Sequence, residues 1–298
     1  LIATSATIYE GTLFIDNMLV FMNEPSVIRP SLATPRVPER GIAHEITFSH
    51  VSFSYPEVPR KVLDDVSFTI RAGESVALVG ENGAGKTTLI KLLTRLYDPT
   101  EGVILLDGHD IREYDHKELY RVFGIIFQDF GKYAFDVREN ITMGDVFAPV
   151  DEVRMQKAAE DADAADYISR LPRGFDTPLT RFFEPDGIEL SIGQWQKLSV
   201  ARAFYAESDV IILDEPTASL DALAEREIYR EFDELRVGKT TLFVSHRLSS
   251  ATSADKILVL EYGKLVEEGT HADLMEKQGR YHELFTAQAE RYQSENNK

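Results

Sequence analysis

Two patterns of hydrophobic and polar residues recur along this chain, and each predicts a different kind of strand. Residues 45–55 (EITFSHVSFSY) alternate apolar and polar positions, which is typical of a half-buried strand, and residues 62–70 alternate more weakly. Three shorter runs, residues 75–79, 210–213 and 241–244, are mostly or wholly apolar, as strands covered on both faces of a sheet are. Polar residues and a helical pattern follow each of these runs, so we expect an α/β domain with a mainly parallel sheet.

The remaining patterns place helices and a hairpin around this sheet. Residues from about 136 to 206 show helical patterns and no convincing strand, which predicts an inserted helical subdomain. Residues 256–260 and 264–267 predict a terminal hairpin around Gly263, and the residues from His271 onward predict two helices.

The first 22 residues predict an amphipathic helix rather than a membrane span. Apolar residues such as Ile15, Met18 and Met22 fall near helical spacing. A spanning helix needs about 20 mostly apolar residues, and polar residues including Glu10 and Asp16 interrupt this stretch.

A proline-rich segment separates this helix from the rest of the chain. Four prolines occur between residues 23 and 40, so we interpret residues 23–42 as a linker. Residues 43–290 then form the main domain, and residues 291–298 form a tail. The chain begins with Leu1 rather than Met, which we interpret as a piece of a longer protein.

The charge balance excludes several classes of function. The 298 residues include 50 acidic and 32 basic side chains, for a formal net charge of −18. This excess argues against a protein whose main task is to hold DNA or RNA phosphates, so we expect no nucleic-acid partner. Cysteine is absent, which excludes a disulfide framework, a thiolate zinc site and a cysteine nucleophile.

Residues 80–88 (GENGAGKTT) fit the phosphate-loop pattern G-x-x-x-x-G-K-[ST]. The glycines let several backbone N–H groups point at one anion, and the N-terminus of the following helix adds positive potential. Lys86 supplies a positive charge for the β and γ phosphates, and Thr87 offers a hydroxyl to Mg²⁺. A chance glycine-rich turn is the alternative, but a buried strand before the loop and a helical stretch at residues 87–96 favour the phosphate loop.

Residues 210–216 (VIILDEP) are a buried strand that ends in two carboxylates. Open α/β sheets bind ligands at this carboxyl edge. We expect Asp214 to hold the Mg²⁺ shell and Glu215 to orient and activate the attacking water. An ordinary strand end followed by a helix cap is the alternative when the motif is taken alone.

Residues 190–194 (LSIGQ), about 20 residues before VIILDEP, resemble the signature motif of ATP-binding cassette (ABC) ATPases, usually LSGGQ. Four further motifs of that family occur along the chain, two before and two after these residues, in the order that the family shows. Tyr55 resembles the aromatic residue that stacks on adenine, Gln128 the Q-loop glutamine, Ser219-Leu220-Asp221 the D-loop, and His246 the switch histidine.

The resemblance implies a fold and a composite site. The fold is a P-loop NTPase cassette with a mainly parallel core sheet, an antiparallel β subdomain and an inserted helical signature subdomain. Two cassettes meet head to tail, so that Ser191, Gly193 and Gln194 touch the ATP held by the partner cassette, while Ser219 and Asp221 lie at the dimer interface.

The resemblance also assigns roles around ATP and Mg²⁺. The nucleotide-binding residues are Tyr55, Gly80, Asn82, Gly83, Gly85, Lys86, Thr87 and Thr88. The catalytic residues are Lys86, Gln128, Glu215 and His246, and the metal-binding residues are Thr87, Gln128 and Asp214.

Two stretches depart from the family pattern. Ile192 replaces the first glycine of GGQ, which affects the expected rate more than the fold. Residues 179–191 (LTRFFEPDGIELS) replace a GERG-like stretch that faces the membrane domain in exporters, so the coupling surface is expected to differ.

The ends of the chain resemble those of exporter cassettes. Residues 269–288 carry the pattern G-T-H-x-x-L followed by Y-x-x-L-x-x-x-Q, and the leader with its linker resembles the cytosolic end of a last transmembrane helix. The resemblance implies an ATPase at the cytoplasmic face of a membrane, partnered by a transmembrane domain and, by default, an identical cassette. An importer cassette, a soluble ABC ATPase acting on nucleic acid or ribosomes, and a non-hydrolysing nucleotide-gated module are the alternatives.

Overall fold

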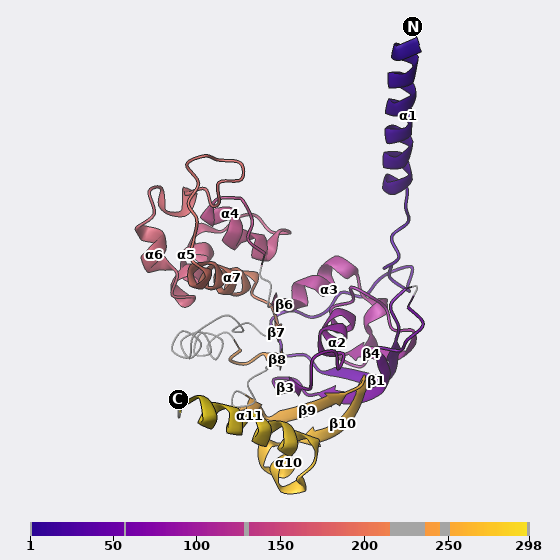
Figure 1. Ribbon diagram of the computed structural model, residues 1–298, viewed down its shortest axis with the longest axis vertical. Coiled ribbons are helices and arrows are strands. Elements are labelled where there is room, and N and C mark those ends of the chain that lie inside the picture. Colours follow the sequence, from indigo (N-terminus) through magenta and orange to yellow (C-terminus); the bar gives the residue numbers. More distant parts are fainter. Residues whose placement is uncertain (1, 57, 128–130, 215–235, 245–250, 297–298) are drawn as a thin grey trace.

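The structure, a computed structural model, describes residues 2–56, 58–127, 131–214, 236–244 and 251–296 (Figure 1). Five predicted site residues therefore lie outside the described residues. They are Gln128, Glu215, Ser219, Asp221 and His246.

A six-stranded sheet forms the centre of the molecule. Its strand order is β10-β9-β3-β8-β7-β6, and every neighbouring pair is parallel except β9 and β10. The mainly parallel sheet expected from the apolar runs is thus confirmed. The strands are β3 (Ser75–Val79), β6 (Phe123–Ile126), β7 (Val210–Asp214), β8 (Thr240–Val244), β9 (Lys256–Glu261) and β10 (Lys264–Gly269).

Both faces of this sheet are covered, which explains why its strands are apolar at nearly every position. In β3, the buried side chains of Ala77 and Val79 join one hydrophobic core, whereas those of Val76 and Leu78 join a second core on the opposite face. The first core is shared with the helical subdomain and the C-terminal helices. The second is shared with the antiparallel sheet and helix α2 (Lys86–Leu93).

The antiparallel sheet has the strand order β2-β1-β4-β5. Strands β1 (Ile46–Phe53) and β2 (Leu63–Ile70) confirm the two alternating patterns, whereas β4 (Glu101–Leu106) and β5 (His109–Asp110) were not predicted by residue pattern. Strand β4 begins with an exposed Glu101 and with Gly102 at a φ of 80°. A Cβ at Gly102 would lie 2.2 Å from the carbonyl oxygen of His50, so the close pairing with β1 requires glycine.

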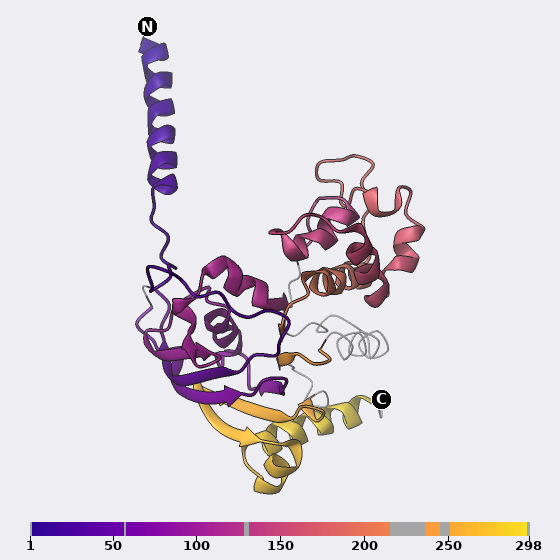
Figure 2. The same ribbon diagram turned by 180° about the vertical axis from the view of Figure 1, so that it is seen from behind.

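The helical subdomain lies beside the β6–β7 side of the central sheet, and the antiparallel sheet lies on the other side with α2 (Figures 1 and 2). Asp136 caps its first helix through a capping box with Glu139, and Trp195 is buried in its core. The expected absence of strands holds for the described residues of this region, apart from isolated bridges. Its helices are α4 (Val137–Thr142), α5 (Glu152–Asp161), α6 (Ala165–Ser169) and α7 (Ile192–Ala206).

The C-terminal elements confirm their prediction. Strands β9 and β10 form the hairpin, and Gly263 in its turn has a φ of 78°. Helices α10 (His271–Lys277) and α11 (Arg280–Asn296) follow. The remaining elements are α3 (His116–Val122) and the 3₁₀ turns Ile111–Glu113, Met143–Asp145 and Gly174–Asp176.

The N-terminal segment is helical, as predicted, in α1 (Ile2–Met22), which projects from the rest of the chain (Figure 1). Its exposed apolar side chains do not form one stripe, however, since Leu13, Phe14 and Ile15 are consecutive. Successive helical residues point about 100° apart, so the amphipathic interpretation, which counted only every third or fourth residue, is wrong. No helix among the described residues combines the length and apolar character that a membrane span requires.

Residues 23–42 contain no helix and little regular structure, but much of this linker is docked on the main domain. The fully buried Arg95 donates a hydrogen bond to the carbonyl oxygen of Arg29 at 2.6 Å. Further along, Arg36 forms an ion pair with Glu113 at 2.7 Å and a parallel bridge with Tyr114. Proline restricts its own φ without preventing such contacts, so an extended segment lies along the surface.

Candidate nucleotide-binding site

The phosphate loop lies between β3 and α2, and its conformation depends on glycine. Gly80, Gly83 and Gly85 have φ values of 158°, 80° and 109°. A Cβ at Gly80 would lie 2.2 Å from the carbonyl oxygen of Leu260, and one at Gly85 would lie 2.8 Å from Leu63 Cδ2. Side chains at these two positions would therefore push the loop away from the strands beneath it.

Lys86 is the first residue of α2, and its side chain is buried. Its Nζ donates to the carbonyl oxygens of Gly80 at 2.7 Å and Glu81 at 3.1 Å. The ammonium group is therefore held inside the curve of the loop, next to the N-terminus of the helix. A negatively charged phosphate placed there would meet a fixed cation, the backbone and the helix dipole together.

Thr87 and Asp214 come together from distant parts of the sequence. The Thr87 hydroxyl donates to Asp214 Oδ2 at 3.4 Å, and Asp214 is buried at the end of β7. The contact arises because β3 and β7 run parallel and end at the same edge of the sheet. A hydroxyl and a carboxylate are hard oxygen donors, and Mg²⁺ commonly takes one or two carboxylates together with substrate phosphates, so this pair fits the metal.

Tyr55 lies next to the same loop. Its hydroxyl is 3.1 Å from the Thr88 hydroxyl, and its half-buried ring meets Phe53 and Tyr97 in edge-to-face contacts at 5.0 and 5.3 Å. The structure thus brings Tyr55 to the phosphate loop, while stacking on adenine stays a prediction. Tyr97 was missed by the sequence analysis because it carries no motif and approaches Tyr55 only in the folded chain.

The signature residues form the N-terminus of α7. Ser191 Oγ accepts from the backbone N–H of Gln194 at 3.2 Å, and Gln194 Oε1 accepts from the backbone N–H of Ser191 at 2.9 Å, which is a capping box. Ile192 is 53% exposed, and a Cβ at Gly193 would meet no atom within 4 Å. The motif therefore faces outward.

Within the described residues, the predicted site is divided between two groups. Tyr55, Thr88 and Asp214 gather around the phosphate loop, on whose exposed part Asn82 lies. Among the described residues, no hydrogen bond joins the signature residues to that loop. The roles of Gln128, Glu215, Ser219, Asp221 and His246 lie outside the described residues and stay predictions.

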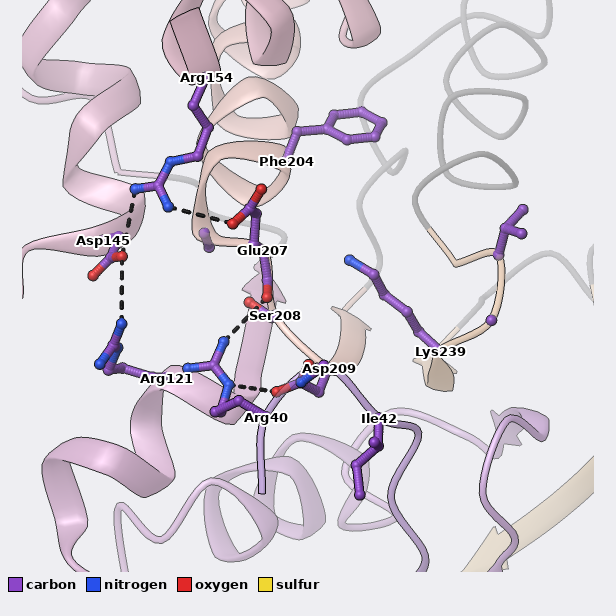
Figure 3. A pocket seen from close by; sticks show the side chains of 14 residues that line it. Arg40, Ile42, Arg121, Asp145, Arg154, Phe204, Glu207, Ser208, Asp209 and Lys239 are labelled. Atoms are coloured by element: carbon purple, nitrogen blue, oxygen red, sulfur yellow. Dashed lines mark hydrogen bonds and ion pairs between the residues drawn. The ribbon is translucent and has the colours of Figure 1, made fainter. Parts of the chain in front are cut away.

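A cavity of about 710 Å³ lies at the opposite edge of the sheet from the phosphate loop, where β7 and β8 begin (Figure 3). We name it the seam cavity because linker, core sheet and helical subdomain all line it. Arg40 of the linker forms an ion pair with the buried Asp209, whose other carboxylate oxygen accepts from the backbone N–H of Gly41 at 2.8 Å. Arg40 also donates to the carbonyl oxygen of Glu207 at 3.1 Å.

Ion pairs continue from there into the helical subdomain. Arg154 approaches Glu207 and Asp145 at 3.4 Å each, and Arg121 approaches Asp145 at 3.8 Å (Figure 3). Lys239 points into the same cavity, burial lowers its pKa, and no ion pair with it is found in the described part of the chain. None of the predicted site residues that the structure describes lines the seam cavity, and no local motif could have revealed it.

Comparison with known proteins shows the family to which the phosphate loop and the signature motif belong. Residues 63–218 match the family described as ABC transporter. A putative multidrug export ATP-binding/permease protein of Staphylococcus aureus is 44% identical over 243 residues, which is 82% of this chain and 41% of that protein. YgaD of Bacillus subtilis, with the same description, is 41% identical over shares of the same size. This chain thus spans about two fifths of the length of these relatives.

A solved structure supports the same conclusion about the fold. The chain is similar to a bacterial Atm1-family ABC exporter with ATP bound, with a TM-score of 0.83 and 34% sequence identity. The similarity covers 95% of this chain and 48% of that one. The part of the chain that is similar to this exporter therefore contains the cassette fold that the ordered motifs predicted.

Proposed function

Since this chain belongs to the ABC transporter family, we propose that it hydrolyses ATP and that this hydrolysis powers export across a membrane. Its fold and relatives are those of an exporter-type ATP-binding domain. The observation that carries the proposal is the buried Lys86, held by backbone carbonyls inside a glycine loop beside Thr87 and Asp214.

Binding of ATP follows from this arrangement. The loop amides and the N-terminus of α2 surround the phosphates, and Lys86 exchanges its bonds to Gly80 and Glu81 for phosphate oxygens. Thr87 and Asp214 would hold Mg²⁺, which neutralises charge on the β and γ phosphates when it is bound. We propose that Tyr55 stacks on the adenine ring, which its contact with Thr88 at the end of the loop supports.

The chemical step requires the residues beyond the described ranges. A water oxygen forms a bond to the γ phosphorus, the bond from that phosphorus to the β–γ bridging oxygen breaks, and ADP leaves. In our proposal Glu215 accepts the proton of the attacking water, Gln128 contacts the metal shell, and His246 stabilises the transferred phosphate.

The signature motif supports the need for a second cassette. Its capped helix end faces outward and is not bonded to the phosphate loop within the described chain. We propose that an identical chain supplies Ser191, Gly193 and Gln194 to each nucleotide, with Ser219 and Asp221 at the dimer interface. Neither chain alone then holds a complete site, and cleavage of ATP separates the pair.

An aromatic surface on the helical subdomain supports a membrane-embedded partner. Phe182 is 80% exposed and Phe183 is 72% exposed, and with Tyr133 and Phe135 they line a cavity of about 620 Å³. Exposed apolar patches of this kind mark interaction surfaces. We propose that the transmembrane domain of the same transporter covers it at the cytoplasmic face, where this stretch departs from the usual exporter sequence.

A complementation assay tests the composite site. Lys86→Met removes the phosphate-loop cation, and Ser191→Arg blocks the signature, so each variant alone should show no Mg²⁺-dependent ATP turnover. In an equal mixture, half of the dimers pair one chain of each kind and hold one intact site. Turnover of about a quarter of the parent rate is expected if pairing is random in a two-fold symmetric dimer.

Two results would contradict this proposal. A mixture as inactive as its components, although native mass measurement shows mixed dimers, would exclude sharing of the site between chains. Full activity of Ser191→Arg alone would exclude a role for the signature. Glu215→Gln should bind ATP without turnover, whereas the control Glu276→Gln, an exposed position on α10, should hydrolyse at the parent rate.

A further inference from the structure

We propose that Arg280, the first residue of α11, is a positioning residue for the phosphate loop, so that the C-terminal helix controls the affinity for ATP. This inference rests on the proposed ATP site. Arg280 Nη2 lies 2.6 Å from Glu81 Oε1, and Glu81 is the second residue of the loop. No motif in the sequence connects these two residues, which are separated by 199 positions.

Arg280 holds the loop against the strand beneath it. Its Nε lies 2.8 Å from Glu261 Oε1, at the end of β9, while its Nη2 holds Glu81. The neighbouring residue of β9, Leu260, has the carbonyl oxygen that packs against Gly80. One guanidinium group thus bridges the loop and the strand end on which the loop rests, and its planar shape allows both contacts at once.

The start of α11 is itself held in place by hydrogen bonds, so the position of Arg280 next to Glu81 is determined by the fold. The Glu267 carboxylate accepts from the backbone N–H of Arg280 at 2.9 Å and of Tyr281 at 2.8 Å. The Tyr281 side chain is fully buried, and its hydroxyl is 2.8 Å from His271 Nδ1. These bonds anchor the first turn of the helix to β10 and α10.

Glu81 explains why the loop needs this arginine. A carboxylate on a loop that binds a triphosphate repels the ligand, and the carbonyl groups of Gly80 and Glu81 also hold Lys86. Arg280 offsets part of the charge of Glu81 and keeps its side chain turned toward α11, while it also pairs with Glu261 and with Glu283 at 3.0 Å. Glu81 is 59% exposed on its side chain, so salt screens the repulsion and the effect is largest at low ionic strength.

The test measures the equilibrium Kd for ATP by titrating the full chain with ATP at low salt. Arg280→Ala should raise the Kd for ATP about three- to tenfold, as an unscreened nearby charge does. The double variant Glu81→Gln/Arg280→Ala should bind ATP more tightly than Arg280→Ala, because the carboxylate on the loop itself is then gone, while Glu261 and Glu283 remain. In 0.5 M salt, the Arg280→Ala effect should shrink.

Lys277→Ala is the matched control, since Lys277 is an exposed cation of α10 that donates only to the carbonyl oxygen of Glu268 among the contacts described. Equal Kd values for Arg280→Ala and Lys277→Ala would overturn the proposal. A double variant with the same Kd as Arg280→Ala would also overturn it, since Arg280 would then act through its other contacts and not through Glu81. If the parent chain binds no ATP, the proposed function itself fails. That outcome differs from the two above, in which the parent binds ATP and only the comparison between variants fails.

Discussion

Two lysines at opposite edges of the central sheet are held in different ways. Lys86 follows β3 at the carboxyl edge, and two backbone carbonyl groups of its own loop accept its hydrogen bonds. Lys239 precedes β8 at the amino edge and points into the seam cavity, where no ion pair with it is found in the described ranges. The ammonium group of Lys86 is held by the backbone of its own loop, whereas that of Lys239 faces the seam cavity.

The residues around the two lysines also differ in how far apart they lie in the sequence. The phosphate loop is one continuous stretch, residues 80–88, whose shape follows from its glycines. The seam cavity takes charged side chains from the linker, the helical subdomain and the core sheet. The two carbonyl groups that hold Lys86 lie within six residues of it, whereas the ion pairs of the seam form only when three parts of the chain have packed together.

The largest expected effect is a difference in ATP turnover between the same substitution made at each of the two lysines. Lys86→Met should lower ATP turnover by at least about a hundredfold, as loss of a group that stabilises transition-state charge does. Lys239→Met, the same change at the other edge, should leave turnover unchanged. Steady-state phosphate release measures both, and similar losses in the two variants would remove the distinction between the edges.

Breaking the seam should affect stability and leave the nucleotide loop alone. Asp209→Ala removes a buried carboxylate that pairs with Arg40 and accepts from Gly41, and it should lower the free energy of unfolding by about 2 kcal/mol. Asp186→Ala is the control, because its pair with Arg173 is exposed and contributes at most about 1 kcal/mol. Denaturant titration compares them, and equal losses would show that the seam is no stronger than a surface pair.

The smallest expected effect is a change in the pH dependence of stability. Burial lowers the pKa of Lys239 from 10.5, so the folded chain releases this proton at a lower pH than the unfolded chain does. Stability should therefore rise with pH between the lowered pKa and about 10.5. In Lys239→Met this rise should be absent, and the variant should be slightly more stable than the parent at neutral pH, because it places no charge in the cavity. A rise in the variant as steep as in the parent, or steeper, would contradict this assignment.

Local patterns predicted every strand of the central sheet except β6, and they predicted these elements better than the contacts between them. Each apolar run became a strand because both faces of the sheet are covered, and the hairpin at Gly263 formed at the predicted position. Strand β4 was missed because its exposed Glu101 and Gly102 interrupt any alternation. The stripe expected on α1 was wrong, since consecutive apolar residues point in all directions around a helix.

By itself, the sequence determined the phosphate loop, the order of the cassette motifs and the class of the fold. These depend on short-range chemistry: glycine for unusual φ values, apolar runs for buried strands, and serine for a helix cap. Only the tertiary structure decided that Thr87 meets Asp214, that Arg40 of the linker pairs with Asp209, and that Arg280 reaches Glu81. Charge pairs between distant positions carry no local pattern, because packing of the elements alone brings them within hydrogen-bond distance.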